Sequence, residues 1–268
     1  MTMARPTGIS AVFALWILWA LVGLVWTPHD PRATAYLDAV GSGVSWQHWM
    51  GVDRLGRDVF SRVWLASGNT VLLGATAAAG ALAVAAGLVA LEQRGPRAVG
   101  DVVRSTTAAG LALPVLFVGM ILLVFLPASP WTLVLACTVG GVPLAFRQLR
   151  VIWMEQAAAL HVAASRALGA GWRHLLTFTL WPNLKPQAAA LARLLFAASV
   201  LELSGLSFLG LAGDPDHAEL GVLLRQHQAY VFAEPMLVLW PGLFLSGLLL
   251  VVHLANVRAS ARRRRVAG

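Results

Sequence analysis

The charged side chains that could do chemistry concentrate in one short stretch, His48–Arg62, which reads HWMGVDRLGRDVFSR. Asp58 and Arg62 are four positions apart, so on a helix they would lie on one face and could form an ion pair. Gly51 and Gly56 suit turns. Two interpretations follow: the stretch is either a gate or docking element, or a cap that anchors the next helix at a membrane interface.

A second stretch, His161–Pro182, is basic and lies between two strongly apolar runs. We expect a short helix over Val162–Leu168, a break at Gly169-Ala170-Gly171, and a second amphipathic piece over Trp172–Leu180 that is closed by Pro182 and Pro186. Such a helix–glycine–helix unit can lie along a membrane face and present a knob to a partner. The alternative is an ordinary surface loop.

A few ionisable residues fall inside apolar runs, where they are costly and often functional. Glu202 and Ser207 are candidate residues of a transport pathway, although Glu202 could equally sit at the interface. We expect Arg193 to extend toward the inner interface or to pair with a partner subunit. The sequence also contains dispersed histidines that could contact a metal transiently, or simply be interfacial: His29, His48, His217 and His227.

The familiar catalytic motifs are absent from the sequence. The chain has a single lysine, Lys185, and it does not stand in a P-loop, so ATP and Mg²⁺ would have to bind on another subunit. We find no zinc-protease, nucleophile-elbow or paired-cysteine motif, and Cys137 is the only cysteine. We therefore expect no enzyme activity and no cofactor or metal bound by this chain itself.

The composition points to the membrane. Hydrophobic residues make up 58% of the 268 positions and charged residues only 12%, whereas a soluble domain carries about 25% charged residues. The net charge of +8 could suggest a nucleic-acid partner, but the basic residues cluster at the ends of apolar runs. Arg262–Arg265 follows such a run directly, which favours contact with lipid head groups over nucleic acid.

Six apolar runs are long enough to be membrane-spanning helices, and we expect an all-α polytopic fold with one permease-like domain over 1–268. The apolar run at the N-terminus is longer than that of a secretory signal, so we read it as a retained helix. The six expected spans are Ile9–Trp26, Asn69–Leu91, Thr106–Leu126, Trp131–Phe146, Gln187–Phe208 and Met236–Val257.

The distribution of arginine predicts the orientation. Most arginines fall in segments that are cytoplasmic if both termini are inside, and most aspartates and glutamates fall on the other side. In this topology the stretch 27–62 is an outer loop and the stretch 147–185 is a cytoplasmic loop.

Four motifs together resemble the permeases of binding-protein-dependent ABC importers, specifically the dipeptide, oligopeptide and nickel family. In the outer loop Val52 replaces a threonine of the family pattern, but the other fixed positions match. In the cytoplasmic loop Ala163 stands where the family has glutamate and Ser165 where it has alanine, while Gly169 and Pro182 match. GLSFLG over 205–210 and Trp240-Pro241-Gly242 also fit. The matching outer-loop residues are Gly51, Asp53, Gly56, Arg57, Asp58, Ser61 and Arg62.

This resemblance implies the type I ABC importer permease fold and a location in the bacterial inner membrane. It implies a sister permease, two ATP-binding subunits inside and a solute-binding protein outside. The cytoplasmic loop would be the coupling loop that receives mechanical work from the ATPase. The coupling residues implied by the match are Ala163, Ala164, Ser165, Arg166, Gly169, Ala170 and Pro182.

The cargo is the least determined part of this interpretation. Gln47–Arg62 and the Ala-Ser-Arg start of the coupling loop look most like nickel permeases, which places a metal chelate slightly ahead of a short peptide. A secondary transporter or channel working without an ATPase is the alternative class, but such proteins usually keep paired ionisable groups at the midplane. A membrane enzyme would need a polar catalytic cluster that the sequence does not contain.

Overall fold

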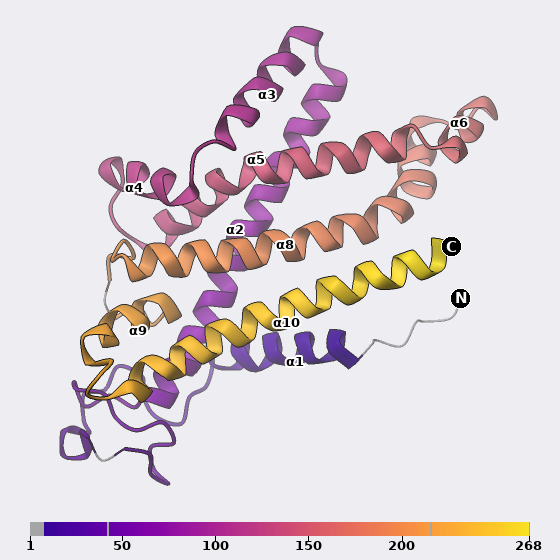
Figure 1. The fold of residues 1–268 in the computed structure, drawn as a ribbon. Coiled ribbons are helices and arrows are strands. Elements are labelled where there is room, and N and C mark those ends of the chain that lie inside the picture. Colours follow the sequence, from indigo (N-terminus) through magenta and orange to yellow (C-terminus); the bar gives the residue numbers. More distant parts are fainter. Residues whose placement is uncertain (1–7, 42, 215, 268) are drawn as a thin grey trace.

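The computed structural model describes residues 8–41, 43–214 and 216–267, and they are almost entirely helical (Figure 1). The only extended pairing among them is an isolated bridge between Val52 and Asp58. The α-helices are α1 (Gly8–Val22), α2 (Val59–Arg94), α3 (Arg97–Gly110), α4 (Val115–Phe125), α5 (Pro130–Ala157), α6 (Leu160–Ala167), α7 (Trp172–His174), α8 (Trp181–Phe208), α9 (Leu220–His227) and α10 (Pro235–Ala267).

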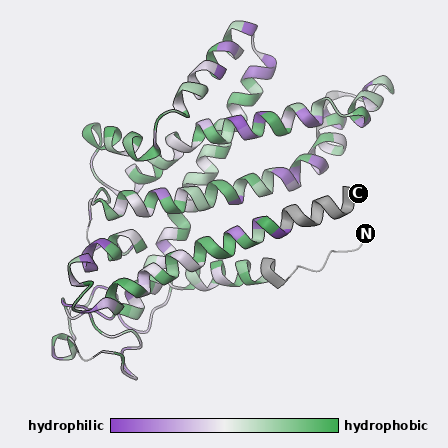
Figure 2. Cartoon of the chain, viewed as in Figure 1, coloured by the Kyte–Doolittle hydropathy of each residue, from purple (hydrophilic) through white to green (hydrophobic). Residues whose placement is uncertain are grey.

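Four of the described helices, α2, α5, α8 and α10, are long and apolar enough to cross a membrane, and the number is five if the bent pair α3–α4 counts as one span. In Figure 1, α5, α8 and α10 run side by side and α2 crosses them. Figure 2 shows that these helices are largely hydrophobic along their middle parts. The structure therefore confirms an all-helical fold with four or five candidate membrane spans among the described residues, where six were expected.

The expected span Thr106–Leu126 is wrong as a single straight helix. It divides into α3 and α4, which meet at an angle of 98°. The residue before a proline is disfavoured in the helical conformation, so Pro114 separates the two helices and becomes the residue that precedes α4. Gly110, at the end of α3, packs so closely on Pro143 of α5 that an added Cβ would lie 2.7 Å from the proline ring.

Several other boundaries also differ from the prediction. Helix α2 begins ten residues before the expected Asn69 and is 36 residues long, and α5 continues past Phe146 to Ala157. Pro182 does not close a helix: it lies in the first turn of α8, where a proline is tolerated because the first N–H groups are unpaired anyway. The first expected span corresponds to the shorter helix α1.

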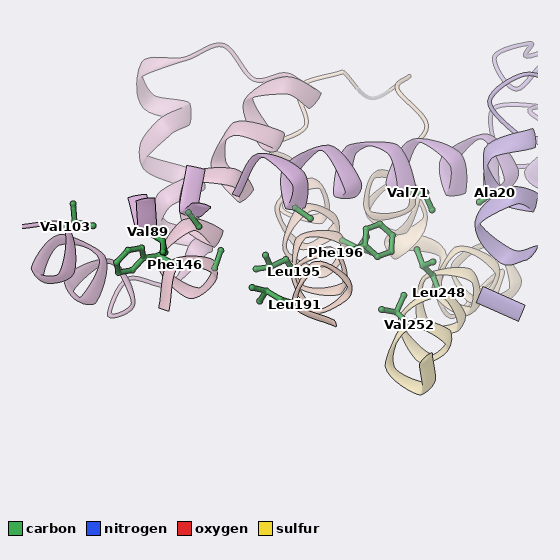
Figure 3. Close-up of a cluster of buried hydrophobic side chains, with 14 residues drawn as sticks. Ala20, Val71, Val89, Val103, Phe146, Leu191, Leu195, Phe196, Leu248 and Val252 are labelled. Atoms are coloured by element: carbon green, nitrogen blue, oxygen red, sulfur yellow. The ribbon is translucent and has the colours of Figure 1, made fainter. Parts of the chain in front are cut away.

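Buried hydrophobic side chains hold the bundle together (Figure 3). The largest cluster joins Ala20 of α1, Val71 of α2, Phe146 of α5, Phe196 of α8 and Leu248 of α10. Because lipid is as apolar as these side chains, close packing rather than water exclusion stabilises such a bundle. The cluster follows α2 along most of its length, so α2 is the element on which the other helices assemble.

The polar segments lie at opposite ends of the bundle. We call residues 27–62, which include the first turn of α2, the loop cap; it packs beside α9 at the same end. We call residues 158–180, which join α5 to α8, the connector. Figure 1 places α6 of the connector at the same end as the start of α1 and the end of α10. The side chains of Arg262–Arg265 lie outside the part of the chain whose side chains are described.

Candidate functional site

The centre of the loop cap is a buried cluster of opposite charges. Asp53 accepts hydrogen bonds from the backbone N–H of Leu55 and Arg57 at 2.9 and 3.0 Å and from Arg57 Nε at 2.8 Å. Arg62 donates to the carbonyl of Pro31 at 3.2 Å and to Gln226 Oε1 of α9 at 3.0 Å. The cluster thereby ties the loop to the first turn of α2 and to α9.

The environment of Asp53 favours its charged form. Burial by itself would raise the pKa of this carboxyl, but the adjacent His227 ring, the Arg57 backbone N–H and the Arg57 guanidinium outweigh it and hold the pKa at about 2. Asp53, Arg57 and Arg62 are each less than 5% exposed. A buried charge pair of this kind is sensitive to the loss of either partner, because the remaining charge is left without compensation.

The predicted ion pair between Asp58 and Arg62 is wrong. Asp58 is the N-cap residue of α2: its Oδ2 accepts the Ser61 backbone N–H at 2.8 Å, and its Oδ1 is 2.8 Å from His48 Nδ1. N-capping satisfies a helix donor that would otherwise be unpaired, so the carboxylate turns back to the helix start instead of reaching one turn forward. Arg62 is left to bridge to α9.

The two glycines of this motif occupy turns that require them. Gly51 and Gly56 have φ angles of +80° and +75°, a region that glycine enters without steric cost. The carbonyl of Gly51 accepts the Val59 N–H at 3.1 Å. The turns predicted at these positions are therefore confirmed.

In the connector, α6 ends in a Schellman motif built around Gly169. The Gly169 N–H donates to the carbonyl of Arg166 at 3.0 Å, and the Ala170 N–H donates to that of Ser165 at 3.1 Å. Gly169 has a φ of +82°. The predicted short helix followed by a glycine break is confirmed, although the second piece passes through a π-helical stretch, Leu175–Leu180, directly into α8.

Among the side chains that the structure describes, a small buried cluster packs the connector onto itself. Val162, Leu175 and Leu180 are buried against one another, with Trp153 and Leu184 packed beside them. Several large hydrophobic side chains remain exposed around this cluster: Leu160, Leu168, Phe178 and Trp181. Exposed apolar side chains on a polar segment that joins two long helices are candidate contacts for a partner.

The predicted coupling residues gather on this connector and at the start of α8. Ser165 and Ala170 are half-buried, and the others are exposed: Ala163, Ala164, Arg166, Gly169 and Pro182. A cavity of about 980 Å³ lies between the connector and the ends of α2 and α5, with Arg94, Trp153, Arg166 and Trp181 among its lining residues. The connector is therefore a protruding, loosely supported unit.

The two candidate pathway residues do not meet. Glu202 is half-buried and lines a cavity of about 160 Å³ at the break between α3 and α4, together with Gly110, Leu113 and Ser199. Ser207 is buried and lines a separate cavity of about 340 Å³ beside α9. They lie on one helix, α8, but face different spaces.

Arg193 has a partner within the chain. Its Nε donates to Asn256 Oδ1 of α10 at 2.8 Å. The expectation that Arg193 also extends toward the inner interface or pairs with a partner subunit stays a prediction. The sequence did contain Asn256 as an isolated polar residue in the last apolar run.

Two polar residues of structural importance were missed in the sequence. Gln226 receives hydrogen bonds from both Arg57 and Arg62, at 3.5 and 3.0 Å. Glu219 caps α9 and accepts the hydroxyls of Thr70 on α2 and Ser204 on α8, at 3.0 and 2.7 Å. A glutamate just before an apolar helical run is an N-cap signal, but its long-range partners had no local signature.

The chain matches the family described as binding-protein-dependent transport system inner membrane component over residues 80–265. It is 31% identical over 238 residues to the nickel transport system permease protein NikC of Escherichia coli (strain K12), with 87% of this chain and 84% of that protein covered. It is 27% identical over 250 residues to the di/tripeptide transport system permease protein DppC of Pseudomonas aeruginosa, with 91% and 79% covered.

The fold resembles that of a solved membrane protein, the inward-facing MetNI methionine ABC transporter. The TM-score is 0.58 at 17% identity, and the match covers 76% of this chain and 95% of that chain. This chain belongs to the family of binding-protein-dependent transport system inner membrane components. It is a permease subunit of the inner membrane, and the ATPase of such a transporter is a separate subunit. The alternative of a transporter or channel without an ATPase is therefore wrong.

Proposed function

We propose that this chain forms half of the translocation pathway of an ATP-driven importer. It would pair with a sister permease, bind two ATP-hydrolysing subunits through the connector, and receive cargo from a solute-binding protein. The observation that carries this proposal is the connector itself, with its exposed apolar side chains around a glycine-terminated helix. ATP and Mg²⁺ would bind on the ATPase subunits.

The proposed topology has six spans and both termini in the cytoplasm. Helix α1 and the bent pair α3–α4 would complete the set with the four long helices. The arrangement in Figure 1 supports this, because the start of α1, the end of α10 and the connector lie at one end of the bundle. Residues 1–268 would form one permease domain, with the outer loop over 27–62 and the cytoplasmic coupling loop over 147–185.

The connector lacks a negative charge at Ala163. The family pattern places a glutamate here, and an exposed alanine offers no charge to the ATPase. We infer that the connector of this chain binds its ATPase through apolar contacts and that the sister permease supplies the anchoring charge.

For the cargo we propose a nickel-type metal chelate ahead of a short peptide. The chain is 31% identical to a nickel permease over 238 residues and 29% identical to a putative peptide permease over 251 residues, so the preference rests on the nickel-like segments Gln47–Arg62 and Ala164-Ser165-Arg166. Competition uptake in a strain lacking this chain would decide: loss of metal accumulation supports the chelate, and loss of growth on dipeptides with normal metal levels supports the peptide.

The importer proposal is tested by assembly. The chain alone, reconstituted in liposomes, should neither hydrolyse ATP nor take up cargo, and the chain expressed with its neighbouring subunits should co-purify an ATPase. ATP turnover by the chain alone, or absence of any ATPase from the purified complex, contradicts the proposal. Reporter fusions at Gly268 and near Asp216 should lie on opposite sides of the membrane.

A further inference from the structure

Three potential metal ligands from different parts of the loop cap converge at the start of α2. His29 lies seven residues after the end of α1 at Val22, His48 precedes the Gly51 turn, and Asp58 caps α2. One ligand atom from each lies within 4.8 Å of the other two. The two imidazole rings are 5.0 Å apart, centre to centre.

The ring of His29 supplies the most telling detail. Its Nδ1 is buried and has no hydrogen-bond partner among the described residues, which is costly for a polar atom. This nitrogen lies 3.7 Å from Asp58 Oδ2, too far for a hydrogen bond. The distance is instead close to the roughly 3.4 Å that separates two ligands of a tetrahedral ion with bonds of about 2.0–2.1 Å.

The second histidine is already aligned with the carboxylate. His48 Nδ1 is 2.8 Å from Asp58 Oδ1, so a metal ion would replace the shared proton after a small separation of the two atoms. Asp58 would keep the Ser61 N–H on Oδ2, and this bond would hold the carboxylate in a fixed orientation, as partners of metal ligands commonly do. The ligand set can therefore form without dismantling the helix cap.

The remaining side of the group is open. The side chain of His29 is 27% exposed, and a cavity of about 260 Å³ beside it is lined by Pro28, Trp46, Trp49 and Asp58 among others. Catalytic and exchanging metal sites keep such an open position, whereas structural zinc sites are closed by four protein ligands. Water or a chelator could complete the coordination from this cavity.

We propose that His29, His48 and Asp58 bind a divalent first-row transition-metal ion whose open coordination positions face this cavity. Two imidazoles and one carboxylate suit nickel, cobalt, zinc, copper or iron, and they do not suit calcium or magnesium, which prefer oxygen ligands. The placement of the site on the outer face rests on the proposed function. There, arriving metal cargo would exchange ligands before it enters the pathway.

The test uses the purified full-length chain in detergent, titrated with Co²⁺ as the probe. We expect one Co²⁺ per chain and the visible d–d absorption of a low-symmetry site with nitrogen and oxygen ligands. His29→Phe should weaken this binding by more than about 100-fold. This substitution keeps a ring against Tyr36, whose ring centre is 5.5 Å away, and keeps the backbone bond from His29 N–H to Ser61 Oγ. The matched control is His217→Phe, which changes a histidine between α8 and α9 that is outside the cluster and should bind Co²⁺ like wild type.

Asp58→Asn provides a second variant should His29→Phe fail to fold. Asparagine is also a good N-cap, but it removes the anionic ligand, so Co²⁺ affinity should again fall. Equal Co²⁺ binding by wild type and both variants, or no binding by wild type, overturns the inference. The importer proposal is judged separately by co-purification of an ATPase, which neither variant should change. Metal binding without an ATPase would retain the site and reject the importer.

Discussion

In the loop cap the seven residues that match the family motif between Gly51 and Arg62 are all buried, whereas in the connector most of the candidate coupling residues are exposed. The charged side chains of the loop cap have partners within the chain: Arg57 donates to Asp53, and Arg62 donates to Gln226 of α9. The connector has only a small apolar cluster of its own and leaves large hydrophobic side chains in the open. A sequence motif can thus consist of buried residues that stabilise the fold, or of exposed residues that are available to contact another subunit.

The largest expected effect comes from breaking the buried cluster of the loop cap. Arg57→Met would remove the guanidinium that donates to Asp53 at 2.8 Å and leave that buried carboxylate without its direct partner, so we expect a loss of roughly 3–5 kcal/mol in the free energy of unfolding. Thermal unfolding of the purified chain in detergent measures it. The matched control is Arg54→Met, since Arg54 pairs with Glu234 at the surface and such pairs contribute roughly 0–1 kcal/mol. Equal losses in both variants would contradict the distinction.

A smaller effect is expected from pH. Because the pKa of Asp53 is lowered from 3.8 to about 2, its contribution of about 2 kcal/mol is present above pH 4 and is lost as the pH falls toward 2. Pepsin, which is active in this range, should cut the loop cap faster at pH 2 than at pH 4. Asp53→Asn should be cut rapidly at both values, and the exposed Asp38→Asn should behave like wild type. Identical profiles for all three would remove Asp53 as the cause.

In the connector we expect strain without unfolding. Gly169→Val forces a branched residue into a left-handed conformation, at a cost of about 1–2 kcal/mol confined to the end of α6. The protein should insert and accumulate normally, while the ATP turnover stimulated by the binding protein should fall sharply. Gly171→Val is the control, because an added Cβ meets no neighbour within 4 Å at either glycine and only Gly169 has a positive φ. Normal stimulation in Gly169→Val would show that the connector does not transmit work.

The smallest effect on stability is expected where the connector is most exposed. Leu168 is 88% exposed, so Leu168→Asp should leave thermal unfolding unchanged. It should nevertheless reduce the amount of ATPase that co-purifies, because it places a charge in an apolar contact. Val44→Asp, an equally drastic change on the loop cap, should not affect the ATPase. Retention of the ATPase by Leu168→Asp would move the docking surface elsewhere.

The sequence predicted those features that depend on a few neighbouring residues. Glycine turns, the short helix of the connector and the long apolar helices all follow from local periodicity and backbone preference, and the structure confirms them. The break at Pro114 was missed because the apolar run continues through it without a charge. The partners of Arg62 and Arg193 were missed because they are Gln226 and Asn256, more than sixty residues away along the chain.

Pro182 illustrates a different limit. A proline after a short helix commonly marks the end of that helix, but proline is also frequent in the first turn of the next helix. Only the path of the chain decides between the two. Here the π-helical stretch carries the backbone directly into α8, so the boundary that the sequence suggested does not exist.

Helix α2 begins in the loop cap and ends beside the cavity under the connector. At a rise of about 1.5 Å per residue, its 36 residues make a rod about 54 Å long, well beyond the roughly 30 Å of a bilayer core. Unlike α5, α8 and α10, it contains no proline at which it could bend. A tilt of about 5° would move its far end by about 5 Å. A small rotation of α2 at the connector would therefore displace the loop cap, as in a lever.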